Sequence, residues 1–124
     1  MTDGWYGVDL DGTLAEYHGW PADGSIGPPV PAMVERVKRW HAEGREVRIV
    51  TARVAATGRQ NAEGTRDDWE FADAQKLKIR DWCHQHLGFG LVATCKKDLL
   101  METLWDDRCV QVEPNTGRRM DGGE

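Results

Sequence analysis

Two aspartates stand one residue apart near the start of the chain, in the stretch VDLDGTL. Asp9 and Asp11 follow a short apolar run and precede Gly12 and Thr13. Because side chains alternate along a strand, both carboxylates would lie on one face if the extended conformation continues through Leu10. Glycine would then allow a sharp turn. Two like charges where a buried strand ends indicate a chemical role.

Three more polar clusters follow apolar runs farther along the chain. They are Thr51-Ala52-Arg53, Lys96-Lys97-Asp98 and Asp106-Asp107. If the last cluster approaches the two N-terminal aspartates, three or four carboxylates converge. Each pair would then repel by roughly 3 kcal/mol at ~6 Å and an effective dielectric of ~20. A divalent cation and a lysine would offset this repulsion, and hard oxygen ligands favour Mg²⁺.

The segments between these clusters predict alternating strands and helices. Strands are expected at Trp5–Val8, Val47–Val50, Leu91–Thr94 and Thr103–Trp105, and helices from Ala32 toward Gly44 and from about Trp69 to Leu87. Leu77, Ile79 and Trp82 of the second helix are expected to face inward, and a further short apolar run lies at Cys109–Val112. Such alternation is typical of a parallel sheet, whose ligands bind beyond the carboxyl ends of the strands. We therefore expect an α/β fold, a three-layer Rossmann-like sheet with helices on both faces and all four clusters at one edge.

Length and composition restrict the class of protein. A chain of 124 residues is long enough for one core and too short for two, so we expect one domain over residues 1–113 and a flexible tail over 114–124. The net charge of −5 disfavours nonspecific nucleic-acid binding. No apolar run approaches the roughly 20 residues that span a bilayer, and no signal pattern precedes the first strand. These features predict a cytoplasmic protein without a membrane partner, and they leave its oligomeric state open.

The ordered clusters resemble the motifs of the haloacid dehalogenase-like hydrolases, most of which are phosphatases. That family's DxDGT motif is matched by Asp9 to Thr13, its Ser or Thr by Thr51, its lysine by Lys96 or Lys97, and its acidic pair by Asp106-Asp107. The resemblance spans about Trp5 to Val112. The stretches IGPPVP, VRIVTAR and ETLWDDRCVQVE look like a small phage- and prophage-associated branch. The chain has no room for a cap domain, so the resemblance says little about which ester is cleaved.

The resemblance implies a Mg²⁺-dependent phosphatase acting on a small phosphorylated substrate through an aspartyl-phosphate. Asp9 would attack phosphorus, while Asp11 would protonate the leaving oxygen and later deprotonate water. Mg²⁺ would be held by Asp9, the main-chain carbonyl of Asp11 and Asp107, with Asp106 as a ligand or a neighbour of the ligands. Since the lysine of this branch directly precedes an aspartate, Lys97 is favoured over Lys96, although the sequence does not decide between them.

Further residues would complete the site. Thr51 and the turn after Asp9 would bind the phosphoryl oxygens. The expected substrate contacts are Leu10, Gly12, Thr13, Ala52 and Arg53, with a plain surface charge as the alternative for Arg53. Tyr17, His18 and Trp20 are either a flap over the site or packing residues. The loop from Ala55 to Asp68 is either a lid or a connector.

Two other functions remain open at this stage. A catalytically idle phosphate-binding module would act through a partner, and a phosphoacceptor domain would signal through a long-lived aspartyl-phosphate. Asp11 argues against both, because a second carboxylate is useful mainly for proton transfer and would accelerate hydrolysis. Nucleotides or nucleic-acid ends are plausible substrates if the phage-like resemblance holds, although the net charge does not favour nucleic acid.

Overall fold

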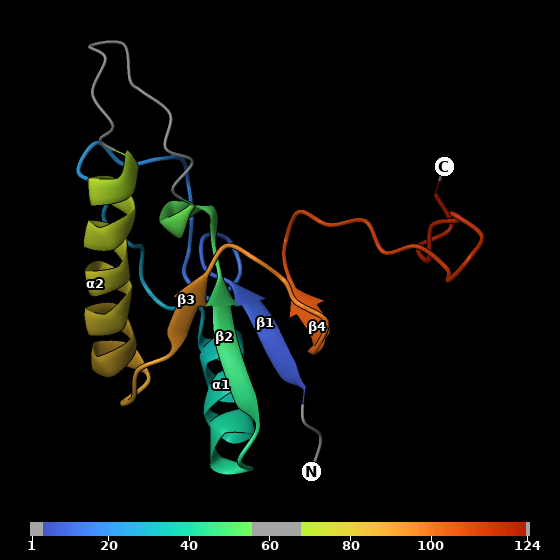
Figure 1. The fold of residues 1–124 in the computed structure, drawn as a ribbon, viewed down its shortest axis with the longest axis horizontal. Helices are drawn as coiled ribbons and strands as arrows, with labels where there is room; N and C mark the ends of the chain where they lie inside the picture. The colour runs from blue at the N-terminus through green and yellow to red at the C-terminus, as the bar shows by residue number, and fades with distance from the viewer. Residues whose placement is uncertain (1–3, 56–67, 124) are drawn as a thin grey trace.

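A computed structural model of the chain describes residues 4–55 and 68–123, which form a parallel sheet with two α-helices and one short 3₁₀ helix (Figure 1). The strands are β1 (Trp5–Asp9), β2 (Glu46–Val50), β3 (Val92–Thr94) and β4 (Met101–Trp105), and the helices are α1 (Pro31–Ala42), α2 (Asp68–His86) and the short 3₁₀ helix η1 (Ala52–Val54). The strands lie in the order β3-β2-β1-β4, and every neighbouring pair is parallel. The prediction of a parallel α/β fold is therefore confirmed.

Helix α1 begins and ends where the sequence signals predict. Pro31 occupies its first turn, where a missing N–H costs no intrahelical hydrogen bond. Gly44 follows the helix with a φ of +80°, a conformation that glycine adopts without strain. Trp40 packs between the rings of Tyr6 and Trp105, with centroid distances of 5.1 and 5.2 Å. These contacts hold α1 against β1 and β4.

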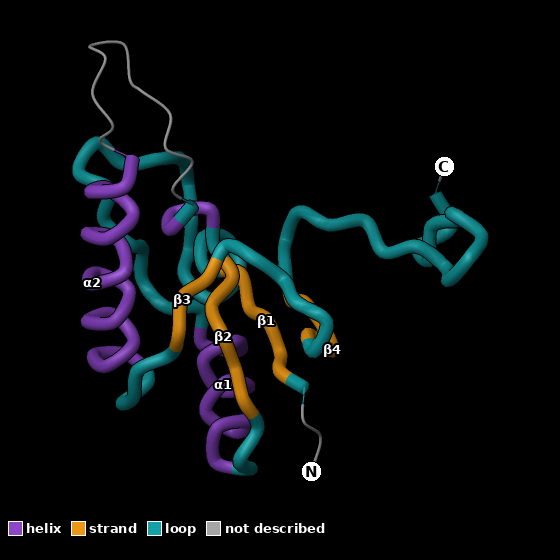
Figure 2. Tube along the Cα trace, viewed as in Figure 1, coloured by secondary structure: helices purple, strands orange, loops and turns teal. Residues whose placement is uncertain are grey.

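Both long helices bury their apolar sides in one core on the same face of the sheet (Figure 2). Val8 of β1 and Ile49 of β2 lie in this core together with Val37 of α1 and Ile79 of α2. The structure describes no helix on the opposite face within residues 4–55 and 68–123, where helices were expected. The chain crosses that face between β3 and β4 through residues 95–100, which contain no helix. A helical crossover needs about 10–12 residues, so this connection is too short for one.

A polar network covers part of the face that lacks a helix. Trp5 is fully buried there, with the guanidinium of Arg48 lying 4.4 Å from its ring centroid. The indole Nε1 donates a hydrogen bond of 2.8 Å to Asp98, which also accepts one of 3.2 Å from Arg48. Asp98 belongs to the crossing segment, so these bonds fasten that segment to the N-terminal end of β1.

One detail of the sequence interpretation is wrong. Leu77 was expected to face inward from α2, but it is 54% exposed, whereas Gln75 is 2% exposed. The run from Cys109 to Val112 does not form a strand. Instead Val112 pairs with Arg119 in a small turn of the C-terminal segment, which runs away from the sheet beyond β4 (Figure 1). No helix within the described parts of the chain is long and apolar enough to cross a bilayer.

Candidate active site

Asp9 lies close to Asp106 and Asp107 at the topological switch point of the sheet, where the strand order reverses between β1 and β4. Asp9 ends β1, and Asp106 and Asp107 directly follow β4, its neighbour. From β1 the chain proceeds to β2 on the other side and only later returns to β4. A crevice outside the carboxyl ends of strands at such a reversal is the usual ligand site of open parallel sheets. The topology alone therefore points to the same residues as the motifs.

The three carboxylates are close enough to share a cation. One ligand oxygen from each of Asp9, Asp106 and Asp107 lies within 4.8 Å of the others. The pKa of Asp9 is raised from 3.8 to about 7, first by burial, then by its hydrogen bond with Asp107 and by the charges of Asp106, Asp107 and Asp11. Negative charge at Asp9 is thus poorly compensated by the protein itself. This oxygen-only donor set fits a hard divalent cation such as Mg²⁺.

The turn after β1 brings Asp9 and Asp107 together. Gly12 has a φ of +95°, and a Cβ at this position would collide with the Asp107 carboxylate. Glycine is therefore needed both for the backbone conformation and for the close approach of the acid. The Thr13 hydroxyl lies 3.4 Å from an oxygen of Asp9 and 3.4 Å from one of Asp107. It can donate to only one of them at a time, so Thr13 steadies the pair without neutralising it.

Leu10 lies inside this turn with a different role from its neighbours. Its side chain is fully buried in the core, and its carbonyl accepts hydrogen bonds from the amides of Thr13, Leu14 and Ala15. The side chain therefore anchors the turn to the core and is not a surface for substrate. A contact between Leu10 and a phosphoryl group could involve only its backbone.

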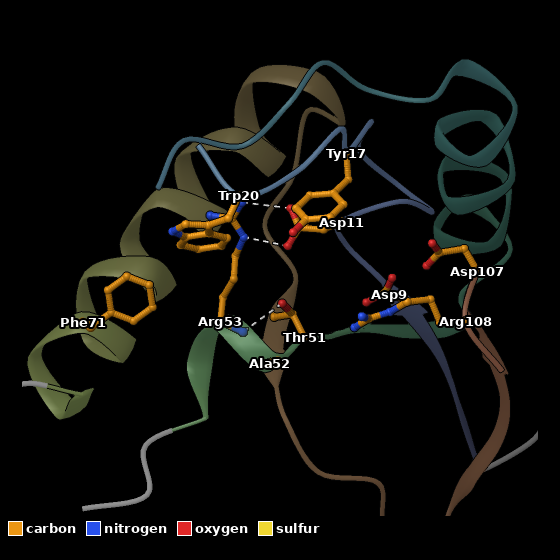
Figure 3. Close-up of a pocket in the computed structure, with 10 residues that line it drawn as sticks. All are labelled: Asp9, Asp11, Tyr17, Trp20, Thr51, Ala52, Arg53, Phe71, Asp107 and Arg108. Atoms are coloured by element: carbon orange, nitrogen blue, oxygen red, sulfur yellow. Dashed lines mark hydrogen bonds and ion pairs between the residues drawn. The ribbon is translucent and has the colours of Figure 1, made fainter. Parts of the chain in front are cut away.

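A pocket of about 440 Å³ opens beside the carboxylates (Figure 3). Its lining residues are Asp9, Asp11, Tyr17, Trp20, Thr51, Ala52, Arg53, Phe71, Asp107 and Arg108. Thr51 is buried, and its hydroxyl accepts a hydrogen bond of 3.2 Å from the Arg53 amide. That bond leaves the hydroxyl proton available for a phosphoryl oxygen. Six of the residues named from the sequence as site residues therefore line one pocket, together with Tyr17 and Trp20.

Arg53 is buried and fully engaged, so the surface-charge alternative is wrong. Its Nε and Nη2 donate to the two carboxylate oxygens of Asp11 at 2.7 and 2.8 Å. Nη1 donates to the Gly24 carbonyl at 2.6 Å and to Oε1 of Gln75 at 2.8 Å, and Nη2 also donates to the Ser25 carbonyl at 2.9 Å. A guanidinium has five N–H donors, and all five are used. Arg53 therefore has a structural role in this conformation, and it has no N–H group left to bind a phosphate.

The same interaction restrains Asp11. Both of its oxygens accept hydrogen bonds from Arg53, in the parallel arrangement that an arginine–carboxylate pair favours (Figure 3). Each oxygen keeps one further lone pair, and Asp11 still lines the pocket. An acid–base role for Asp11 therefore requires a proton transfer beside the guanidinium, or a partial opening of the pair.

The cation expected from a lysine is not at the pocket wall. Lys96 and Lys97 are exposed on the β3–β4 connection, and neither lines the pocket. Arg108 does line it, from the residue directly after the acidic pair, and its side chain points into the pocket on the side of Asp9 (Figure 3). The Arg108 amide also donates a hydrogen bond of 2.9 Å to Asp106, which shapes this turn. The assignment to Lys97 stays a prediction, and Arg108 is a second candidate.

Sequence reasoning missed three residues of this site. Arg108 was visible in the stretch DDR but was not connected with the phosphate. Phe71 stands four residues before Gln75 and eight before Ile79, at helical spacing from buried positions of α2, so periodicity alone does not mark it as exposed. Gln75 gives no local signal, because its burial depends on Arg53, a residue far away in the sequence. Of the proposed lid, residues 56–67 lie outside the described parts of the chain.

Comparison with known proteins gives no further identification. Searches against protein-family models, curated proteins and solved structures found no match to this chain. Function must therefore be inferred from the order of the motifs and the geometry of the site.

Proposed function

We propose that the chain is a Mg²⁺-dependent phosphatase of the haloacid dehalogenase-like type, without a cap domain, that hydrolyses a phosphate monoester. One observation carries the proposal. Carboxylates from β1 and from the end of β4 converge within 4.8 Å at the reversal point of the sheet, beside a pocket that also contains Asp11 and Thr51. A nucleophile, an acid–base group, a cation site and a phosphate contact are thus available in one place.

In this proposal Asp9 is the nucleophile. One of its oxygens attacks phosphorus in line, the bond to the ester oxygen breaks, and an aspartyl-phosphate forms. Mg²⁺ bound by Asp9, Asp107 and Asp106 would neutralise charge between the carboxylates and the phosphoryl group. Thr51 donates its hydroxyl proton to a phosphoryl oxygen, and Arg108 or Lys97 supplies positive charge. Asp11 gives a proton to the leaving alcohol and then takes one from the water that hydrolyses the intermediate.

The test is phosphate release from a panel of monoesters, with Asp9→Asn as the matched variant. The parent should release phosphate with Mg²⁺, lose activity in EDTA and recover it when Mg²⁺ is restored. Asp9→Asn should lose essentially all turnover, because an amide is not a nucleophile, while its near-identical shape preserves the fold. Activity in metal-free buffer would contradict the cation site. Residual activity of more than a few per cent in the variant would contradict the nucleophile.

A second candidate function is favoured by the Asp11–Arg53 pair. A carboxylate held by two arginine hydrogen bonds suits a rigid phosphate-binding module as well as an enzyme. The module would bind phosphate esters without consuming them and would act through a partner. Calorimetric titration separates the two cases, because the module binds an ester with Mg²⁺ and leaves it intact, whereas the enzyme releases phosphate.

A further inference from the structure

The pocket has an aromatic end that the phosphatase chemistry does not use. Tyr17 and Trp20 come from the segment between β1 and α1, and Phe71 comes from the start of α2. They are 44%, 50% and 43% exposed, respectively. Figure 3 shows Trp20 and Phe71 on the α2 side of the pocket, with Asp9 and Asp107 on the opposite side. Three large apolar rings around one opening are a costly surface unless something covers them.

Trp20 is held in place although half of its surface is exposed. The guanidinium carbon of Arg53 lies 4.6 Å from its ring centroid, and the Phe71 ring lies 6.0 Å away at an interplanar angle of 50°. Arg53 is itself immobilised by its bonds to Asp11 and to the carbonyls of Gly24 and Ser25. The indole therefore rests against an immobilised side chain, which restrains its orientation and lowers the entropy that a stacking ligand must offset.

The shape and polarity of the pocket define what such a ligand must look like. A cavity of about 440 Å³ is within the usual range for small-molecule sites and is far larger than a phosphate group requires. One end offers carboxylates, a hydroxyl and Arg108, and the other offers aromatic faces. A ligand that fits both ends carries a phosphate at one end and a flat ring at the other.

We propose that the leaving group of the substrate carries a planar aromatic ring system that stacks on Trp20 against Phe71 and Tyr17. The inference rests on the proposed function, since it specifies the ester cleaved at Asp9. Aryl phosphates and nucleoside monophosphates share this chemistry, and they differ in the sugar that separates ring from phosphate. Stacking on aromatic side chains tolerates any flat ring, so size and spacing distinguish these two sources.

The experiment compares kcat/KM for adenosine 5′-monophosphate, phenyl phosphate and ribose 5-phosphate. Trp20→Ala and Phe71→Ala are the test variants. Trp69→Ala is the matched control, because Trp69 is 57% exposed near Phe71 but does not line the pocket. The parent should favour a ring-bearing ester over ribose 5-phosphate by about tenfold or more, the scale of one base–aromatic stack. Each test variant should lose most of that preference, while Trp69→Ala should keep the preference of the parent.

The two ring-bearing esters then identify the source. Preference for adenosine 5′-monophosphate over phenyl phosphate indicates a nucleoside leaving group, and the reverse indicates an aryl group directly on the phosphate. Equal kcat/KM for all three esters in the parent would overturn the proposal. So would a ring preference that survives both Trp20→Ala and Phe71→Ala.

A binding measurement keeps this inference separate from the proposed function. The Asp9→Asn protein is titrated calorimetrically with adenosine 5′-monophosphate and with ribose 5-phosphate, both with Mg²⁺. The difference in affinity measures the contribution of stacking without turnover. The ring-bearing ligand should bind about tenfold more tightly, and Trp20→Ala in the same background should remove the difference. If no ester is hydrolysed but this difference is found, the catalytic assignment fails and the aromatic site stands. If esters are hydrolysed and the ligands bind equally, the aromatic site fails alone.

Discussion

Asp9 is the residue at which fold stability and chemistry conflict. Its pKa rises from 3.8 to about 7 because burial and the charges of Asp106, Asp107 and Asp11 disfavour the carboxylate. The proposed reaction needs that same carboxylate in its anionic form at neutral pH. A cation at the acidic cluster resolves the conflict, since it stabilises the anion where the protein does not.

This conflict predicts a pH-dependent stability in metal-free buffer. Between pH 4 and pH 7 the folded protein keeps a proton on Asp9 that the unfolded chain has lost, so the free energy of unfolding falls as the pH rises through this range. Asp9→Asn removes the titrating group. The variant should match the parent near pH 4 and exceed its stability at pH 8 by roughly 1–2 kcal/mol, a value discounted for partial solvent screening.

Urea unfolding in EDTA at several pH values measures this difference. Mg²⁺ should then stabilise the parent at pH 8 and should stabilise Asp9→Asn much less. Parallel stability curves for the two proteins would show that the Asp9 carboxyl titrates normally and that burial and the neighbouring charges do not disfavour its anion.

The source of positive charge is a second question at the scale of single residues. Arg108 lines the pocket, whereas Lys97 is the lysine favoured by the motif. Losing one preorganised donor at a developing charge typically costs a factor of about 100–1,000 in kcat. We expect Arg108→Ala to lose about this factor, and Lys96→Ala and Lys97→Ala to stay within a few-fold of the parent. The rate of phosphate release measured for all three variants shows which residue supplies the charge. A large loss of rate in Lys97→Ala alone would assign the charge to the lysine.

At the scale of elements, Arg53 joins three parts of the chain. From η1 it reaches Asp11 after β1, Gly24 and Ser25 before α1, and Gln75 in α2. The segment that carries Trp20 contains several prolines and glycines and no helix or strand, so it has little structure of its own. Its position over the pocket therefore depends on bonds to other elements, among them those of the guanidinium to Gly24 and Ser25 and that of the Trp82 indole to the Gly27 carbonyl.

Replacement of Arg53 by lysine tests this dependence. Lysine keeps the charge but cannot form the five planar bonds, so Asp11 and Gln75 would lose partners in a buried setting. We expect Arg53→Lys to lower the free energy of unfolding by roughly 2–3 kcal/mol. Arg48→Lys is the matched control, because Arg48 also pairs with two carboxylates but is 27% exposed, and it should cost less than about 1 kcal/mol. Equal losses in the two variants would mean that the Arg53 network is no more than a surface ion pair.

A comparison of α1 with α2 shows which features of a helix its apolar spacing can predict. Apolar spacing located α1, because Met33, Val34, Val37 and Trp40 define one face and Gly44 an end. The same approach failed for α2, where Gln75 takes an inward position and Leu77 faces out. A buried glutamine is favourable only because Arg53 lies opposite it. Such a pairing depends on tertiary structure, which periodicity within one helix does not encode.

For the site as a whole, the sequence predicted which residues the chain topology brings together. It did not predict the hydrogen bonds and directions of their side chains. Strand ends in a parallel sheet share an edge, so the meeting of Asp9 with Asp106 and Asp107 could be anticipated. The engagement of Arg53 and the direction of Arg108 could not, because several partners compete for each guanidinium. The second helical layer was expected from typical folds of this class, but residues 95–100 are too few to supply it.

At the scale of the whole molecule, the C-terminal segment is the least integrated part. Beyond Asp106 its described backbone hydrogen bonds outside strands and helices link only residues within 111–123, such as Glu113 to Arg118 and Met120 to Gln111. The described hydrophobic core contains no residue after Trp105. The segment runs outward from β4 in Figure 1. The folded body therefore gains little from it.

Deleting residues 114–124 should leave both stability and activity nearly unchanged. The truncation breaks the Arg118–Glu113 ion pair, which is exposed and worth at most a few tenths of a kcal/mol, and leaves Arg108 in place. We expect the melting temperature to stay within about 2 °C of the parent, whereas Ile79→Ala, a core control, should cost about 2–5 kcal/mol. Thermal unfolding at two protein concentrations is the measurement. A larger loss in the truncated chain that shrinks on dilution, because the melting temperature of the parent falls, would mean that the segment packs on a second copy, since only an intermolecular contact weakens when the protein is diluted.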